Sequence, residues 1–143
     1  MTQEGQRMSD NELLENFDSH CLSLPFDQSA FDTVTQIMFN EAGNTHTVRR
    51  ALLACDEWIA NVTSYSGGSV LRFLFLPEKD CLTVIFEDNG APFDPTAADK
   101  DMPAFDELYT GGMGVGIIIE TSDETTWKRL NGCNYLLLKF KVT

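Results

Sequence analysis

Three short groups of residues have types and spacings that could carry chemistry. The first is Glu57 and Asn61, four positions apart in a segment with helical periodicity. Residues at i and i+4 lie on one face of a helix, so this carboxylate and this amide would stand side by side. This face points away from the apolar stripe of the same helix, and a solvated polar face is therefore the alternative interpretation. Leu53 and Ala54 share the face and favour partial cover by another part of the chain.

The second group is residues 87–90, with the sequence EDNG, directly after an apolar run. A carboxylate at the end of a strand, Asp88, can accept a hydrogen bond from an amino group such as that of adenine. Gly90 would let a ligand approach the backbone closely. Asp-Asn-Gly is also favourable turn chemistry, so a plain turn is the alternative.

The third group is the glycine-rich stretch 110–116, with the sequence TGGMGVG, at the start of a helical pattern. Glycines before a helix leave backbone N–H groups open to an anion. No Gly-Lys-Ser/Thr follows, which excludes a P-loop, and the β-α-β setting of a dinucleotide fingerprint is missing. A flexible connection into the helix is the alternative.

The surrounding pattern predicts a two-layer α/β (α+β) sandwich with a mostly antiparallel sheet. In chain order we expect a strand at 21–25, helices from about 27 to 43 and 45 to 65, strands at 70–76 and 81–87, a helix at 113–120, and strands at 125–130 and 134–142. Asn131-Gly132 predicts a hairpin turn between the last two strands. Residues 88–112 contain three prolines and little periodicity, which is typical of a functional loop such as a lid. We expect a polar tail over residues 1–16, with a short helix near 11–17, and one domain over 17–143.

Composition restricts the class of partner. The net charge of −12 argues against direct contact with nucleic acid. A bound triphosphate would need Mg²⁺ and backbone N–H groups to supply the positive field. No apolar run is long enough for a membrane span and no apolar signal core is present, so we expect a cytoplasmic protein that does not contact the membrane. The four cysteines lack a C-x-x-C pair and are expected to be reduced and packed as small apolar groups.

In their order and spacing, the three groups resemble the N, G1 and G2 boxes of the histidine-kinase-like (GHKL) ATPase superfamily. Residues 88–95, DNGAPFDP, are similar to the Asp-x-Gly-x-Pro-Phe-Asp-Pro element of anti-sigma-factor serine/threonine kinases of the RsbW/SpoIIAB type. The GGMG of residues 111–114 and the III of residues 117–119 resemble the stretch that follows in them. The likeness covers roughly residues 20 to 142 and implies a Bergerat-type ATP-binding fold, with helices on one face of the sheet and an ATP lid.

The resemblance implies ATP and Mg²⁺ as ligands. Asp88 would bind the adenine amino group, with Gly90 permitting close approach. Asn61 would bind the Mg²⁺ that bridges the phosphates. Gly112 and Gly114 would present backbone N–H groups to those phosphates.

The same resemblance implies a kinase in which Glu57 is the general base for a serine or threonine hydroxyl. The acceptor would belong to an anti-anti-sigma (STAS) protein, with a sigma factor as second partner and a homodimer as the assembly. Thr110 stands where some members have Arg, and Leu137 lies where the family often has Thr near the adenine. Trp58 is unusual between Glu57 and Asn61 and is assigned to packing. The departures at Thr110 and Leu137 favour, as the alternative, an ATP-binding anti-sigma switch with little or no kinase activity, while a nucleotide-free scaffold is a third candidate.

Overall fold

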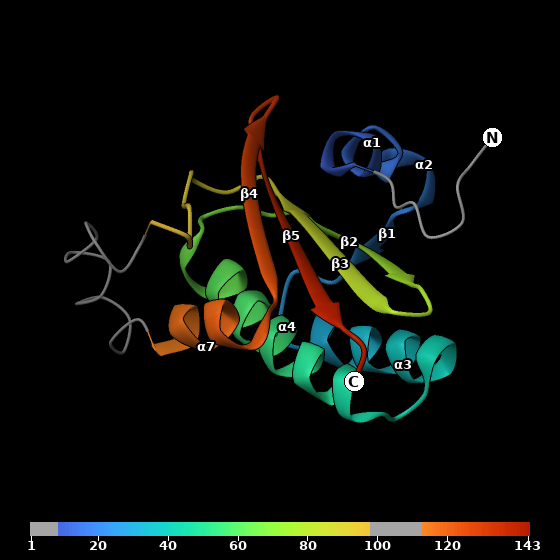
Figure 1. Ribbon diagram of the computed structural model, residues 1–143. Coiled ribbons are helices and arrows are strands. Elements are labelled where there is room, and N and C mark those ends of the chain that lie inside the picture. The colour runs from blue at the N-terminus through green and yellow to red at the C-terminus, as the bar shows by residue number, and fades with distance from the viewer. Residues whose placement is uncertain (1–8, 98–112) are drawn as a thin grey trace.

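The computed structural model describes residues 9–97 and 113–143. In this part of the chain a five-stranded sheet has the order β1-β2-β3-β5-β4, and each neighbouring pair is antiparallel (Figure 1). The strands are β1 (Leu22–Leu24), β2 (Leu71–Pro77), β3 (Cys81–Asp88), β4 (Glu124–Leu130) and β5 (Cys133–Lys141). Strand β3 is buried along its whole length, because it lies between two strands and both of its faces are covered.

Three helices cover one face of the sheet: α3 (Ala30–Ala42), α4 (His46–Tyr65) and α7 (Met113–Thr121) (Figure 1). The expected stripe of α4 is buried at all five positions, Val48, Leu52, Cys55, Ile59 and Val62. It packs with alternate side chains of the central strands, among them Val84, Phe86, Leu136 and Leu138. The two-layer α/β fold class is therefore confirmed.

The ends of α4 follow simple backbone chemistry. Thr45 is the N-cap, and its side chain accepts a hydrogen bond of 3.1 Å from the backbone N–H of Val48. The chain leaves the helix through Ser66 and Gly67, and Gly67 has a φ of 73° that suits glycine. The next strand, β2, then begins at Leu71.

The opposite face of the sheet carries two short helices, α1 (Asp10–Glu15) and α2 (Phe17–His20) (Figure 1). Leu13 and Phe17 are buried there against strand residues whose side chains alternate away from the main core, Leu74, Ile85 and Leu137. Asp10 forms an ion pair of 3.1 Å with Lys139. Residues 10–16 are therefore packed structure rather than a polar tail, because Leu13 and Phe17 lie four apart and reach one apolar surface. Helices consequently lie on both faces of the sheet, not on one.

Asn131 and Gly132 have φ values of 52° and 78°, which confirms the predicted hairpin turn between β4 and β5. All four cysteines are free; Cys55 and Cys81 are buried, whereas Cys21 and Cys133 are partly exposed.

Of the predicted lid, residues 98–112 lie outside the described part. Within residues 9–97 and 113–143, no helix is long and apolar enough to cross a bilayer.

Candidate functional site

Asp88 is the last residue of β3 and is 1% exposed. Its Oδ1 accepts a hydrogen bond of 2.9 Å from the backbone N–H of Gly90 and one of 3.0 Å from Nδ2 of Asn134. Burial raises the pKa of Asp88, while the hydrogen bonds from Asn134 and Gly90 and the charge of Arg129 act in the opposite direction. Both bonds end on one oxygen, so the second carboxylate oxygen is left for another donor.

Asn134 is a site residue that the sequence analysis did not single out. It lies opposite Asp88 in the β3–β5 register and is 3% exposed. Besides Asp88, its Nδ2 donates to the carbonyl of Ala91 at 2.9 Å. A polar residue at the start of the last strand, two positions after the Asn-Gly turn, was the available signal. Leu137, by contrast, packs on the opposite face with Leu13, so it is not the position that adjoins Asp88.

The turn after Asp88 is joined to the end of α4. Ala91 donates its backbone N–H to the carbonyl of Ser66 at 2.9 Å. A Cβ at Gly90 would lie 2.4 Å from Cβ of Ser66, so a side chain there would collide with the protein itself. The close approach that requires glycine is thus made by Ser66, whereas the sequence analysis assigned it to a ligand.

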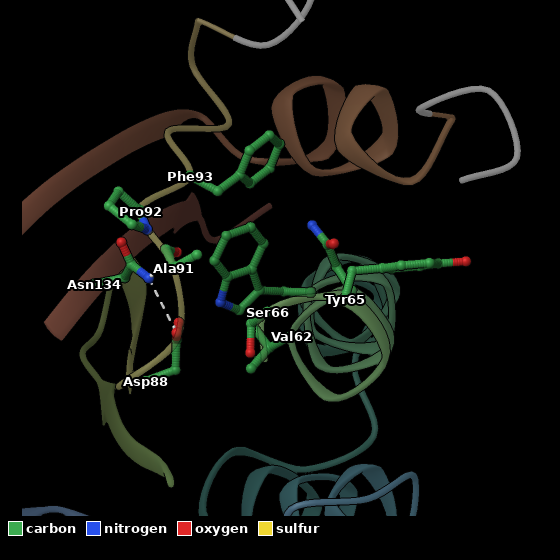
Figure 2. Close-up of a pocket in the computed structure, with 10 residues that line it drawn as sticks. Val62, Tyr65, Ser66, Asp88, Ala91, Pro92, Phe93 and Asn134 are labelled. Carbon is green, nitrogen blue, oxygen red and sulfur yellow. Dashed lines mark hydrogen bonds between the residues drawn. The ribbon is translucent and has the colours of Figure 1, made fainter. Parts of the chain in front are cut away.

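A cavity of about 140 Å³ opens between this turn and the last part of α4 (Figure 2). Asp88 and Asn134 form one side, Val62, Tyr65 and Ser66 the other (Figure 2). The lining also includes Trp58, Asn61, Ala91, Pro92 and Phe93. The cavity is thus largely apolar with a few polar groups at its wall, which is the usual character of a small-molecule site.

Three buried polar atoms of the cavity wall have no hydrogen-bond partner among the described residues: Trp58 Nε1, Asn61 Nδ2 and Asn134 Oδ1. Buried polar groups in native proteins are nearly always paired, because an unpaired one costs about 1–3 kcal/mol. Asn61 is 4% exposed, so the face that it shares with Glu57 is not simply solvated. Trp58, Asn61 and Asn134, which carry the three unpaired atoms, all line one cavity, and this indicates a polar ligand.

Glu57 lies one helical turn before Asn61 and is partly exposed. Partial burial, and secondarily the neighbouring carboxylate of Asp56, raises the pKa of Glu57. It does not line the cavity. Glu57 therefore stands beside the site, on its α4 side, as a carboxylate that takes up a proton more readily than usual.

Comparisons with known proteins identify the architecture. No family model matches the chain, and no curated protein matches it either. Among solved structures, a histidine kinase domain from the Erythrobacter litoralis EL346 blue-light activated histidine kinase matches with a TM-score of 0.50 at 15% identity, over 90% of this chain and 69% of that one. The chain shares the fold of this histidine kinase domain.

Two further structures are similar at lower TM-score. The Acinetobacter baumannii histidine kinase AdeS matches with a TM-score of 0.49 at 14% identity, over 92% of this chain and 75% of that one. The longer Erythrobacter litoralis EL346 blue-light activated histidine kinase matches with a TM-score of 0.49 at 15% identity, over 90% of this chain and 49% of that one.

Within the histidine kinase fold, the predicted site residues are only partly assembled by the described structure. Asn61 and Asp88 line one cavity, Gly90 lies in the turn behind it, and Glu57 lies at its margin. Gly114 is the second residue of α7, which packs against α4. Gly112 and Thr110 lie outside the described residues. The contacts of the Gly112 and Gly114 backbone N–H groups with phosphate therefore remain predictions.

Arg129 is a second residue that sequence reasoning missed. Its Nη1 donates a hydrogen bond of 2.7 Å to the carbonyl of Gly90, which brings a guanidinium to the edge of the site. Its charge also lowers the pKa of Asp88. The chain has a net charge of −12, so Arg129 supplies a positive charge at the edge of the site within an otherwise acidic protein.

Proposed function

We propose that this chain binds Mg-ATP and transfers the γ-phosphoryl group to a serine or threonine hydroxyl of a STAS-type anti-anti-sigma partner, and that it also acts as an anti-sigma factor. The observation that carries the proposal is the buried Asp88 carboxylate, which is held by Asn134 and faces a cavity with unpaired polar atoms. The histidine kinase fold supports a nucleotide as the ligand, and the motif order in the sequence supports the anti-sigma kinase group.

The chemistry of the cavity fits an adenine base. Asp88 has one carboxylate oxygen left to accept a hydrogen bond from the exocyclic amino group. The volume of about 140 Å³ is below the ~300–1,000 Å³ of complete ligand pockets, so the cavity would hold the ring while the phosphates extend beyond it.

Asn61 fits the role of the magnesium ligand. Its side-chain amide lines the cavity, and rotation of the amide exchanges the unpaired nitrogen for an oxygen. Mg²⁺ in phosphate sites commonly takes only one or two protein oxygens and completes its shell with phosphate and water. A single amide oxygen is therefore sufficient, and the described residues contain no cluster of three His, Cys, Asp or Glu side chains that could hold a metal.

The catalytic role falls to Glu57. ATP supplies the phosphoryl group, and Mg²⁺ neutralises its charge, so the protein has mainly to position the nucleophile and receive its proton. Glu57 lies one turn from Asn61, which places a proton acceptor beside the metal ligand. Its raised pKa brings it closer to the working pH, which favours general-base action.

The first test is isothermal titration of the full chain with Mg-ATP and Mg-ADP. We expect binding by the wild type, a loss of at least about tenfold in affinity for Asp88→Asn, and weaker binding for Asn61→Ala only when Mg²⁺ is present. A folded wild-type protein that binds neither nucleotide would overturn the proposal and favour a nucleotide-free scaffold.

The second test addresses phosphotransfer. The chain is incubated with Mg-ATP and purified STAS-domain proteins, and phosphoserine and phosphothreonine are measured by mass spectrometry. We expect transfer that Glu57→Gln reduces by about 10²-fold or more while nucleotide affinity stays unchanged. Transfer that survives the Glu57 substitution would remove this residue from its role.

A second candidate is an ATP-dependent anti-sigma switch with little or no kinase activity. The observation that favours it is the position of Glu57, which lies beside the cavity rather than in its wall. This candidate predicts nucleotide binding without turnover, and an affinity for a sigma-factor partner that differs between the ATP and ADP forms. Partner affinity that does not respond to nucleotide would contradict it.

The partners follow from the same proposal. A chain with a net charge of −12 suits a basic patch on a sigma factor, because complementary charge accelerates association. A homodimer in the cytoplasm is part of the proposal. Analytical sedimentation measures the oligomeric state, and fractionation of cells measures the location.

A further inference from the structure

Trp58 occupies a place in the site that simple packing does not explain. It lies on α4 directly after Glu57 and is 2% exposed. Its side chain lines the cavity and stacks on Phe93, with the ring centroids 6.3 Å apart and the planes inclined by 18°. Phe93 projects into the site from the segment after the Asp88 turn (Figure 2). The stack therefore joins α4 to that segment and holds the indole in one orientation.

The indole N–H of Trp58 is buried and has no acceptor among the described residues. A buried donor without a partner is costly, so its presence calls for an explanation. Trp127 Nε1 is also unpaired, but Trp127 does not line this cavity. Trp58 instead lines the cavity together with Asn61 and Asn134, which each carry another unpaired atom. Three of the six such atoms in residues 9–97 and 113–143 thus belong to residues that line one cavity, as expected where a ligand supplies the missing partners.

The cavity consequently offers a defined hydrogen-bonding pattern. Asp88 and Oδ1 of Asn134 are acceptors, and the Trp58 N–H is a donor. Adenine has a complementary edge, because its exocyclic amino group donates and the ring nitrogens on either side of that group accept. A pyrrole-type N–H donates only, so Trp58 must meet an acceptor on the base.

We infer that Trp58 is a specificity-determining residue of the nucleotide site, whose indole N–H donates a hydrogen bond to a ring nitrogen of adenine. The inference rests on the proposed nucleotide binding and adds to it a second polar contact with the base. Phe93 is the positioning residue, since its ring holds the indole in place. Asp88 accepts a hydrogen bond from the exocyclic amino group and Trp58 donates one to a ring nitrogen, so a base that lacks either group binds less tightly.

The test is titration calorimetry of the full chain with ADP and with 1-deaza-, 3-deaza- and 7-deaza-ADP, each of which replaces one ring nitrogen by C–H. We expect the wild type to bind one of the three analogues about three- to tenfold more weakly than ADP. Trp58→Phe keeps an aromatic ring and removes the N–H, so it should bind ADP more weakly by a similar factor and no longer distinguish ADP from that analogue. Trp127→Phe is the matched control and should behave as the wild type.

The outcomes separate the two claims. Wild-type binding of ADP with no discrimination against any of the deaza analogues would overturn the role of Trp58 and leave nucleotide binding intact. Discrimination that persists in Trp58→Phe would do the same. No binding of ADP by the wild type would overturn both. The wild-type comparison needs no substitution, so the inference stays falsifiable even where Trp58→Phe fails to fold.

Discussion

Nδ2 of Asn134 donates a hydrogen bond to Oδ1 of Asp88 across 3.0 Å, although 46 positions separate the two residues in the chain. Antiparallel pairing of β3 with β5 places them directly opposite each other. The bond satisfies one oxygen of a buried carboxylate and leaves the other for a ligand. Protein stability and ligand binding therefore depend on different atoms of Asp88, and this separation leads to the first prediction.

Asp88→Asn is expected to abolish tight nucleotide binding without destabilising the fold at neutral pH. Burial raises the pKa of Asp88, so its folded-state pKa exceeds the unfolded value. The protonated carboxyl of Asp88 therefore contributes to the free energy of unfolding at low pH, and this contribution is lost as the pH rises through the folded-state pKa. At pH 7 the neutral amide should thus give an equal or higher melting temperature. Asp32→Asn, an exposed control in the first turn of α3, should leave affinity unchanged and lower the melting temperature only slightly, because a negative charge is favourable at a helix N-terminus. A large loss of stability in Asp88→Asn would contradict this account.

Asn134→Ala should loosen the turn after β3. The change removes the donor to Asp88 and to the carbonyl of Ala91, so Oδ1 of Asp88 keeps only the bond from Gly90 and the Ala91 carbonyl loses the bond from Asn134. We expect a loss of about 1–3 kcal/mol in the free energy of unfolding and weaker nucleotide binding. Urea denaturation and calorimetry measure the two effects. Unchanged stability would mean that water replaces the amide.

Gly90→Ala is expected to destabilise the protein by about 1–3 kcal/mol, because its Cβ would lie 2.4 Å from Cβ of Ser66. Ser66→Gly in the same chain removes that carbon and should restore part of the loss. The matched control is Gly116→Ala in α7, where nothing lies within 4 Å of the added carbon. That control should be neutral or stabilising by up to about 1 kcal/mol. Thermal unfolding distinguishes the three variants.

Leu13→Ala should destabilise the protein by about 2–5 kcal/mol, since Leu13 is 6% exposed and packs with Leu74, Ile85 and Leu137 beneath α1. Nucleotide affinity should not change, because this cluster lies on the face of the sheet opposite to α4. Leu53→Ala, at a position 57% exposed, should cost far less. Equal effects of the two substitutions in chemical denaturation would show that α1 is not packed in solution.

The pH profile of phosphotransfer should report Glu57. A general base works when deprotonated, so kcat/KM should rise with pH through the pKa of Glu57, which burial and the neighbouring Asp56 raise above the ordinary value of a glutamate. Asp56→Asn removes the neighbouring negative charge that contributes to this shift. We therefore expect the acid limb to move to lower pH in Asp56→Asn and to vanish in Glu57→Gln. An acid limb that does not respond to Asp56 would assign it to another group.

The local elements could be predicted from the sequence because their signals are short-range. The stripe of α4 repeats with the helical period, Thr45 can cap that helix, and Asn131-Gly132 suits a tight hairpin turn. Asp88 and Asn61 were predicted as site residues from motif order. The packing of α1 was missed, because Leu13 and Phe17 are two apolar residues in a polar segment and their partners are far away in the chain.

The sequence by itself therefore determined the type and order of the elements and the chemical groups available to the site, since period, caps and turns act over a few residues. Only the tertiary structure decided which groups meet. Strand register places Asn134 beside Asp88. The close contact with Ser66 explains why a glycine is needed at position 90. Side-chain packing leaves the indole N–H of Trp58 buried without a partner in a residue that lines the cavity. These relationships join residues far apart in the chain, and pairing of strands and packing of side chains have no local signature from which they could be read.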